Sequence, residues 1–198
     1  MTARSRRPAL GLLLAPGAGA DRDQPTLLAL DRAARAVGMV VERMDFPYRR
    51  AGRRAPDRAP VLVEAVRVEA AELSARCDRL VLGGRSMGGR MCSMAVAEGL
   101  VPQAAGLVLI SYPLHPPGRP EKMRNEHFPN LSLPCLFVSG TRDAFATPAE
   151  LEQATGSIPG PVTHRWVDGR DHSLRSSDQL VVPMVMEWLA GLEPSGQE

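Results

Sequence analysis

The sequence predicts an α/β fold, in which a mostly parallel sheet of about six strands forms the middle of a three-layer sandwich. Two observations lead to this prediction: short apolar runs alternate along the chain with amphipathic segments, and the runs are nearly continuous. Strands that are apolar on both faces are typical of a parallel sheet covered by helices on both sides. Right-handed crossovers then give a doubly wound sheet. The expected strands are residues 9–15, 39–44, 79–83, 106–111, 135–139 and 162–167.

The segments between these strands have helical spacing and recognisable ends. Pro25 lies near the start of the first segment and Gly38 just beyond its end, which is the favoured arrangement for a helix. Thr147 is a good N-cap for a later helix, with Glu150 in the capping-box position. The expected helices are residues 25–37, 60–77, 87–100, 148–155 and 178–192.

Length and loop pattern favour one domain over residues 1–198, since an α/β domain of this size can bury a full core. We expect residues 1–7 and 194–198 to be flexible tails. Residues 48–59 and 112–129 are predicted to be long loops, rich in Pro and Arg, of the kind that often surrounds a functional site. No insertion is long enough for a separate lid domain.

Composition excludes several classes of partner. The formal net charge is only +2, so no global field favours nucleic acid or an anionic membrane. Aromatic residues make up 4% of the chain, which argues against a surface that stacks bases. The three cysteines are odd in number and have no metal spacing, which fits a reducing compartment. We therefore expect a cytoplasmic monomer or homodimer without a metal, a nucleic-acid partner or a membrane partner.

The N-terminus imitates a secretory signal, because three arginines within the first seven residues precede the apolar run 9–15. That run has only seven residues and contains Gly11. It leads into a glycine-rich turn at residues 16–20, and the same succession of apolar run and glycine turn recurs downstream. We therefore interpret the run as a buried strand, with removal as a signal peptide as the alternative.

Residues 79–90 carry the most informative motif, an apolar strand followed by Gly84-x-Ser86-x-Gly88 and a helix-compatible run. A serine on a sharp strand-to-helix turn is exposed at the carboxyl end of the strand, and small residues on both flanks prevent clashes. A helix that begins at Met87 would point backbone N–H groups toward an oxyanion. The alternative is a glycine turn that binds phosphate or reverses the chain, although no Lys-Ser/Thr pair of a P-loop is present.

An acid and a histidine follow this serine in chain order, Asp143 after the strand 135–139 and His172 after the last strand. Serine is a poor nucleophile at its own pKa, so His172 would take its proton and later return it to the leaving group. Asp143 would hold the imidazole tautomer and stabilise its cation. Asp168 and Asp171, which precede the histidine, are alternative acids. Structural rather than catalytic roles are expected for His127 and His164.

Acyl transfer also needs a second donor for the developing negative charge. The turn at residues 16–20 would supply it through the Ala18 N–H beside the Met87 N–H, with Gly19 as the alternative donor. The competing interpretation is that the glycines of this turn only tighten the connection between strand and helix.

Substrate contacts are expected from Arg85 next to the serine and from Tyr112 and His115 in the loop 112–129. Further arginines flank the motifs, and an anionic substrate would follow if several faced one pocket, because guanidinium groups bind carboxylates bidentately. The alternative is that an arginine-rich composition places arginine everywhere. The arginines concerned are Arg85, Arg90, Arg119, Arg142 and Arg170.

With these motifs in place, the sequence resembles small α/β-hydrolases of the dienelactone-hydrolase-like group. It is most similar to testis-expressed hydrolase-like proteins and the hydrolase-like domain of the NSL acetyltransferase complex. The resemblance rests on the opening strand with its PGAGA turn and on residues 83–90, 111–118, 140–143 and 169–172. It implies a compact α/β-hydrolase fold, no metal or organic cofactor, and a triad of Ser86, Asp143 and His172.

Two departures from the relatives limit what the resemblance implies. Many α/β-hydrolases have His-Gly at the oxyanion turn, where this chain has Pro16-Gly17. Dienelactone hydrolases use a cysteine nucleophile, where this chain has Ser86, so their substrate does not transfer. We expect a serine hydrolase that cleaves an ester, thioester or related acyl bond of a small substrate. The alternatives are a catalytically silent interaction module of the same fold and nucleotide binding through the glycine turns.

Overall fold

The computed structural model describes residues 10–192 and contains one parallel sheet of six strands in the order β2-β1-β3-β4-β5-β6. The prediction of a mostly parallel sheet is thus confirmed, and every pairing is parallel. The predicted tails, residues 1–7 and 194–198, lie outside the described residues. The strands are β1 (Leu10–Ala15), β2 (Val40–Arg43), β3 (Arg79–Arg85), β4 (Ala104–Ile110), β5 (Cys135–Gly140) and β6 (Val162–Val167).

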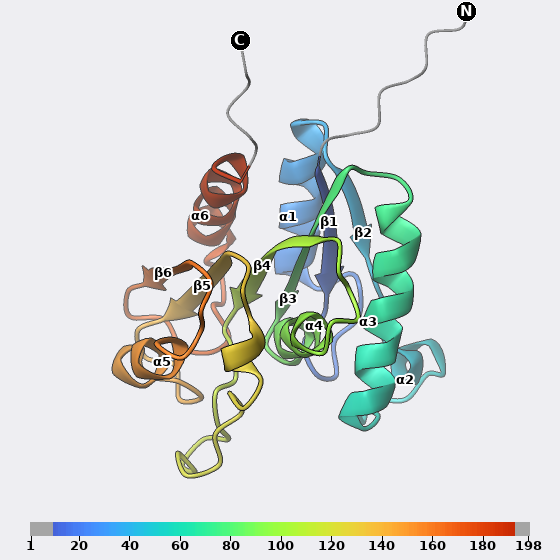
Figure 1. The fold of residues 1–198 in the computed structure, drawn as a ribbon. Helices are drawn as coiled ribbons and strands as arrows, with labels where there is room; N and C mark the ends of the chain where they lie inside the picture. The colour runs from blue at the N-terminus through green and yellow to red at the C-terminus, as the bar shows by residue number, and fades with distance from the viewer. Residues whose placement is uncertain (1–9, 193–198) are drawn as a thin grey trace, which may run out of the picture.

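Helices cover both faces of the sheet (Figure 1). On one face α1 and α6 pack together over an apolar core, and the other face carries the remaining helices over a second core. The two layers of helices and the sheet between them are the expected three-layer sandwich, with one apolar core on each face of the sheet. The helices are α1 (Pro25–Ala36), α2 (Pro47–Arg50), α3 (Ala59–Ser74), α4 (Met87–Ala97), α5 (Pro148–Thr155) and α6 (Asp178–Ala190), with a 3-10 turn η1 (Phe128–Asn130).

Several predicted boundaries were wrong by a few residues. The helix predicted for residues 87–100 ends at Ala97, because Gly99 with φ of 71° turns the chain out of the helix. The helices predicted for residues 60–77 and 178–192 end at Ser74 and Ala190. The short element α2 overlaps the start of the predicted loop 48–59, and η1 overlaps the end of the predicted loop 112–129. The helix predicted for residues 148–155 and the strand predicted for residues 162–167 have the expected bounds. The predicted capping box is also present: the Thr147 side chain accepts from the Glu150 N–H, and the Glu150 carboxylate accepts from the Thr147 N–H.

The apolar run near the N-terminus is the strand β1, fully buried and paired with β2 and β3. The strand interpretation is therefore confirmed for Leu10–Ala15. A Cβ on Gly11 would lie 2.6 Å from the Cys77 Sγ, so the glycine allows this side chain to pack against the strand. In the described part of the chain, no helix is long and apolar enough to cross a membrane.

Because the sheet is parallel, the carboxyl ends of its strands meet at one edge. The chain leaves β1, β3, β5 and β6 at this edge and enters the glycine turn at residues 16–20, then Ser86, Asp143 and the segment 168–174 respectively. We call residues 16–20 the glycine turn and residues 168–174 the histidine loop. The topology thus gathers four segments that are far apart in the sequence.

Candidate active site

Ser86 has the strained backbone that the flanking glycines predict, with φ of 50° and ψ of −116° between β3 and α4. Its N–H donates to the Ile110 carbonyl oxygen at 2.8 Å, which ties the turn to the neighbouring strand β4. A Cβ on Gly84 would lie 2.5 Å from the Gly89 nitrogen, and a Cβ on Gly88 would overlap the Ala15 carbonyl oxygen. Glycine is therefore required on both sides of this serine.

Ser86, His172 and Asp143 form one chain of hydrogen bonds. The distance from the Ser86 Oγ to the His172 Nε2 is 2.8 Å. The His172 Nδ1 lies 3.0 and 2.8 Å from the two carboxylate oxygens of Asp143. Asp143 is 1% exposed, and its Oδ1 also accepts the Phe145 N–H at 2.8 Å. This buried carboxylate thus fixes which nitrogen of the imidazole faces the serine.

The alternative acids have other partners. The Asp168 Oδ1 accepts the Thr141 hydroxyl at 3.1 Å. The exposed Asp171 accepts the N–H and hydroxyl of Ser173 at 2.9 and 2.6 Å, and the Ser173 hydroxyl is the main cause that lowers the Asp171 pKa. Neither carboxylate bonds to the His172 ring, so the geometry favours Asp143 as the acid.

Two side chains hold the histidine loop. The Phe145 ring stacks on the His172 imidazole, with 4.0 Å between centroids and 28° between planes. The Arg85 Nη2 donates to the His172 carbonyl oxygen at 2.6 Å. A Cβ on Gly140 would overlap the Arg170 carbonyl oxygen, so this glycine lets the end of β5 approach the loop closely. Phe145 carries no sequence signal, because its role depends on a contact with a residue 27 positions later.

The glycine turn faces the same pocket as Ser86. Ala18 and Met87 both line this pocket, whose volume is about 490 Å³. The Gly17 N–H donates to the Gln24 Oε1 at 3.0 Å, and the Gly19 N–H donates to the Tyr48 hydroxyl at 3.1 Å. The Ala18 N–H, in contrast, has no hydrogen-bond partner among the described residues. The Gly19 N–H is therefore already hydrogen-bonded, whereas the Ala18 N–H is available to an oxyanion.

Of the residues predicted to contact a substrate, only Arg85 lines the pocket. Tyr112 is 1% exposed, and its hydroxyl donates to the Arg124 carbonyl oxygen at 2.7 Å. His115 is 4% exposed and hydrogen-bonds to the Pro116 carbonyl oxygen and to Glu150. Both side chains are buried beneath the loop 112–129 because the apolar core extends under it. Direct substrate contact by Tyr112 and His115 is thus contradicted by their position.

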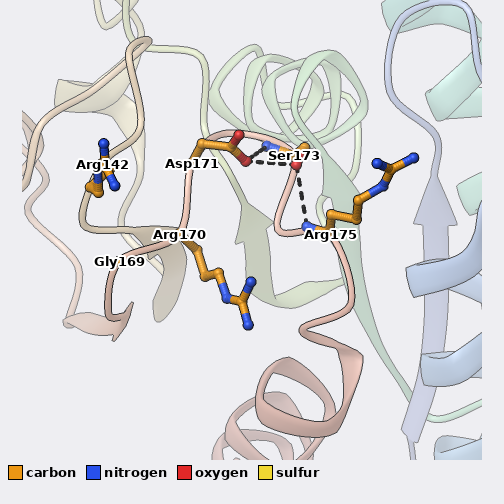
Figure 2. Close-up of a pocket in the computed structure, with 6 residues that line it drawn as sticks. All are labelled: Arg142, Gly169, Arg170, Asp171, Ser173 and Arg175. Carbon is orange, nitrogen blue, oxygen red and sulfur yellow. Dashed lines mark hydrogen bonds between the residues drawn. The ribbon is translucent and has the colours of Figure 1, made fainter.

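The arginines that flank the motifs do not all line one pocket. Arg85 and Arg90 line the pocket of Ser86, together with Arg124, which the sequence motifs do not mark. Arg142 and Arg170 line another cavity of about 620 Å³, and their guanidinium groups point in different directions (Figure 2). Arg119 is exposed and lines neither cavity.

The two remaining histidines have structural contacts. The His127 Nε2 lies 2.7 Å from the Ser93 Oγ, and the His164 Nε2 lies 3.0 Å from the Thr155 Oγ1. Burial is the main cause that lowers the pKa of both imidazoles. Within residues 10–192, no group of three or more His, Cys, Asp or Glu side chains could hold a metal ion.

A parallel α/β sheet with a strained serine between strand and helix, joined to a histidine and a buried acid, defines the α/β-hydrolase class of folds. A family model described as "Alpha/beta hydrolase domain" matches residues 8–181, so the chain belongs to this family.

Similar solved structures agree with this fold. Est1E from Butyrivibrio proteoclasticus is 12% identical with a TM-score of 0.78, over 95% of this chain and 90% of Est1E. A dienelactone hydrolase from Anabaena variabilis is 15% identical with a TM-score of 0.74, over 93% and 87% of the two chains. A structure from work on the metagenome-derived lipolytic enzymes LipS and LipT is 14% identical with a TM-score of 0.77, over 94% and 96%. At these identities the likeness shows the fold.

Proposed function

We propose that the protein is a serine hydrolase of the carboxylesterase or thioesterase type, which cleaves an acyl bond of a small substrate through an acyl-enzyme. The observation that carries this proposal is the hydrogen-bond chain from Ser86 through His172 to Asp143 at a pocket wall. A serine whose proton can pass directly to a held imidazole is an activated nucleophile.

The proposed reaction has two halves. His172 takes the hydroxyl proton as the Ser86 Oγ forms a bond to the acyl carbon, and the Ala18 and Met87 N–H groups stabilise the oxyanion. The bond to the leaving group then breaks, and His172 gives the proton to the departing oxygen or sulfur. A water molecule, deprotonated by His172, then forms a bond to the acyl carbon. The bond from the acyl carbon to the Ser86 Oγ breaks, the acid is released, and His172 returns the proton to the Ser86 Oγ. Asp143 keeps its charge throughout and stabilises the imidazolium.

The names of similar proteins support the reaction class: the neighbours include lipolytic enzymes and a dienelactone hydrolase. We further propose membership of the group of testis-expressed and NSL-complex hydrolase-like proteins, on the motifs quoted above. The proposal also includes a small-molecule acyl substrate and a cytoplasmic location. We propose a monomer or homodimer that binds neither nucleic acid nor a membrane.

Activity-based labelling tests this function. A fluorophosphonate probe should label the wild-type protein, and Ser86→Ala should abolish the labelling while Ser132→Ala, which changes an exposed serine, leaves it intact. A panel of esters and thioesters then identifies the preferred acyl bond. Folded wild-type protein that is neither labelled nor active on the panel would contradict the proposal and favour a noncatalytic interaction module.

A further inference from the structure

Two arginines face the Ser86 pocket without a carboxylate partner. Arg90 lies one turn along α4 from the serine, and its backbone N–H donates to the Ser86 carbonyl oxygen at 3.1 Å. Arg124 reaches the pocket from the loop 112–129, which we call the rim loop. In the described chain neither arginine has a carboxylate within 4.0 Å, although eight other arginines form such ion pairs. No Asp or Glu lines this pocket in the described chain.

The rim loop holds Arg124 in place. The buried Tyr112 hydroxyl donates to the Arg124 carbonyl oxygen at 2.7 Å. The Arg124 Nη1 in turn lies 3.5 Å from the Pro113 carbonyl oxygen. These contacts use one long hydrogen bond of the guanidinium and leave its other donors available to a ligand. The guanidinium is thus oriented in advance, which lowers the entropy lost when a ligand binds.

The two positive charges act on each other. Burial lowers the pKa of Arg124, and the charge of Arg90 lowers it further. The charge of Arg90 also contributes to the lowered pKa of His127. The Arg90 Nε is buried and has no hydrogen-bond partner among the described residues. Like charges and an unsatisfied donor destabilise a partly buried site unless an anion enters it.

We propose that Arg90 and Arg124 bind a carboxylate or phosphate group of the substrate while its acyl carbon lies at the Ser86 Oγ. The inference rests on the proposed function, and it assigns the substrate class as an ester or thioester with a second, anionic group. Planar guanidinium forks suit both anions. Arg85 lines the pocket too, but its Nη2 is bonded to the His172 carbonyl oxygen.

Matched substrates test the proposal. On the acyl side, the mono-4-nitrophenyl ester of adipic acid is compared with 4-nitrophenyl hexanoate. On the leaving-group side, 3-carboxyphenyl and 3-phosphonophenyl butanoate are compared with phenyl butanoate, which also separates a carboxylate site from a phosphate site. We expect kcat/KM to be at least about tenfold higher for an anionic ester than for its neutral match. One charge-assisted hydrogen bond to the anion stabilises the bound ester by enough to give this factor. Higher salt should reduce the ratio.

Variants then locate the site. Arg90→Gln and Arg124→Gln should each lower the ratio of anionic to neutral kcat/KM about tenfold. Arg119→Gln is the matched control, because it makes the same charge change on the exposed part of the rim loop, and it should leave the ratio unchanged. Equal kcat/KM values for every anionic and neutral pair in the wild-type protein would overturn the inference while leaving the hydrolase function intact.

Binding separates this inference from the proposed function. Adipate and 3-carboxyphenol are titrated by calorimetry into the wild-type, Arg90→Gln and Arg124→Gln proteins. Binding that needs both arginines, in a protein that hydrolyses no ester, would support the anion site and overturn the hydrolase. Failure of both binding and turnover would overturn both proposals.

Discussion

The Arg85 Nη2 donates a hydrogen bond of 2.6 Å to the backbone carbonyl oxygen of His172. Arg85 is only 7% exposed, and burial lowers its pKa against the opposing charges of Asp178, Asp143 and Asp171. None of these carboxylates is within ion-pair distance of the guanidinium in the described chain. The buried Arg85 guanidinium therefore lies against the histidine loop, and it hydrogen-bonds to the backbone of His172, the proposed base.

We predict that Arg85 positions His172. Arg85→Met should remove the hydrogen bond and lower kcat about tenfold or more, since a misplaced base slows proton transfer. KM should change by less than about threefold. Arg85→Lys keeps a charge and a donor and should recover part of kcat. Steady-state kinetics on the preferred ester, with thermal unfolding as a check on folding, measure these effects. A purely structural role would instead give equal kcat for both variants once their folded fractions are matched.

Gly88 tests the close packing of the turn that carries Ser86. A Cβ at this position would overlap the carbonyl oxygens of Ala15 and Pro16. Gly88→Ala should therefore lower the free energy of unfolding by about 3 kcal/mol, at the upper end of overpacking effects. Gly191→Ala is the control, because a Cβ there would lie 3.4 Å from its nearest neighbour and φ is −72°. Its effect should stay within about 1 kcal/mol. Denaturant unfolding of both variants gives the comparison, and equal stabilities would contradict the overlap.

Much of the fold could be predicted from sequence because its signals are local. The four central strands β1, β3, β4 and β5 are buried on both faces, so each is a nearly continuous apolar run, whereas the edge strands β2 and β6 are largely half-buried and more polar. Right-handed crossovers then place helices on both faces of the sheet. The ends of helices were predicted less well, because they depend on the conformation of single residues such as Gly99. The helix α2 has four residues and is too short to show a helical period.

The candidate site also has residues that local sequence patterns predict and residues that they do not. Ser86 and its flanking glycines form one contiguous motif, so their geometry could be inferred directly. Phe145 and Arg124 were missed because each reaches the site through a contact between loops that are distant in the sequence. Tyr112 was misplaced for the converse reason: its neighbours along the chain are loop residues, but its ring packs on Phe137 of β5. Tertiary contacts of this kind leave no periodic pattern.

The identity of the acid can be tested by three parallel substitutions. Asp143→Asn should lower kcat by about 10⁴, because an amide in place of the buried carboxylate favours the wrong imidazole tautomer. Asp168→Asn and Asp171→Asn should have effects of less than about threefold, since both carboxylates bond elsewhere. Initial rates on the preferred ester and the rate of fluorophosphonate labelling provide independent measurements. A large loss in either control variant, with Asp143→Asn near wild type, would assign the acid to the histidine loop.

His127 should make stability depend on pH. Its pKa is lowered to about 4, chiefly by burial and then by the charge of Arg90, whereas Glu126 acts in the opposite direction. The unfolded chain, with a histidine pKa of about 6.5, binds a proton before the folded protein does. The contribution of neutral His127 is therefore complete above about pH 6.5 and is lost as the pH falls toward about 4.

The loss can be isolated with His127→Gln, whose amide can still bond to the Ser93 hydroxyl that lies 2.7 Å from the imidazole Nε2. Between pH 7.5 and pH 4.5 the wild-type protein should lose about 2 kcal/mol more unfolding free energy than the variant, after allowance for partial solvent screening. Urea unfolding at several pH values measures the difference, and acid effects from carboxylates cancel between the two proteins. Parallel pH profiles would show that His127 titrates normally in the folded state, and a loss at high pH would reverse the sign argued from its burial.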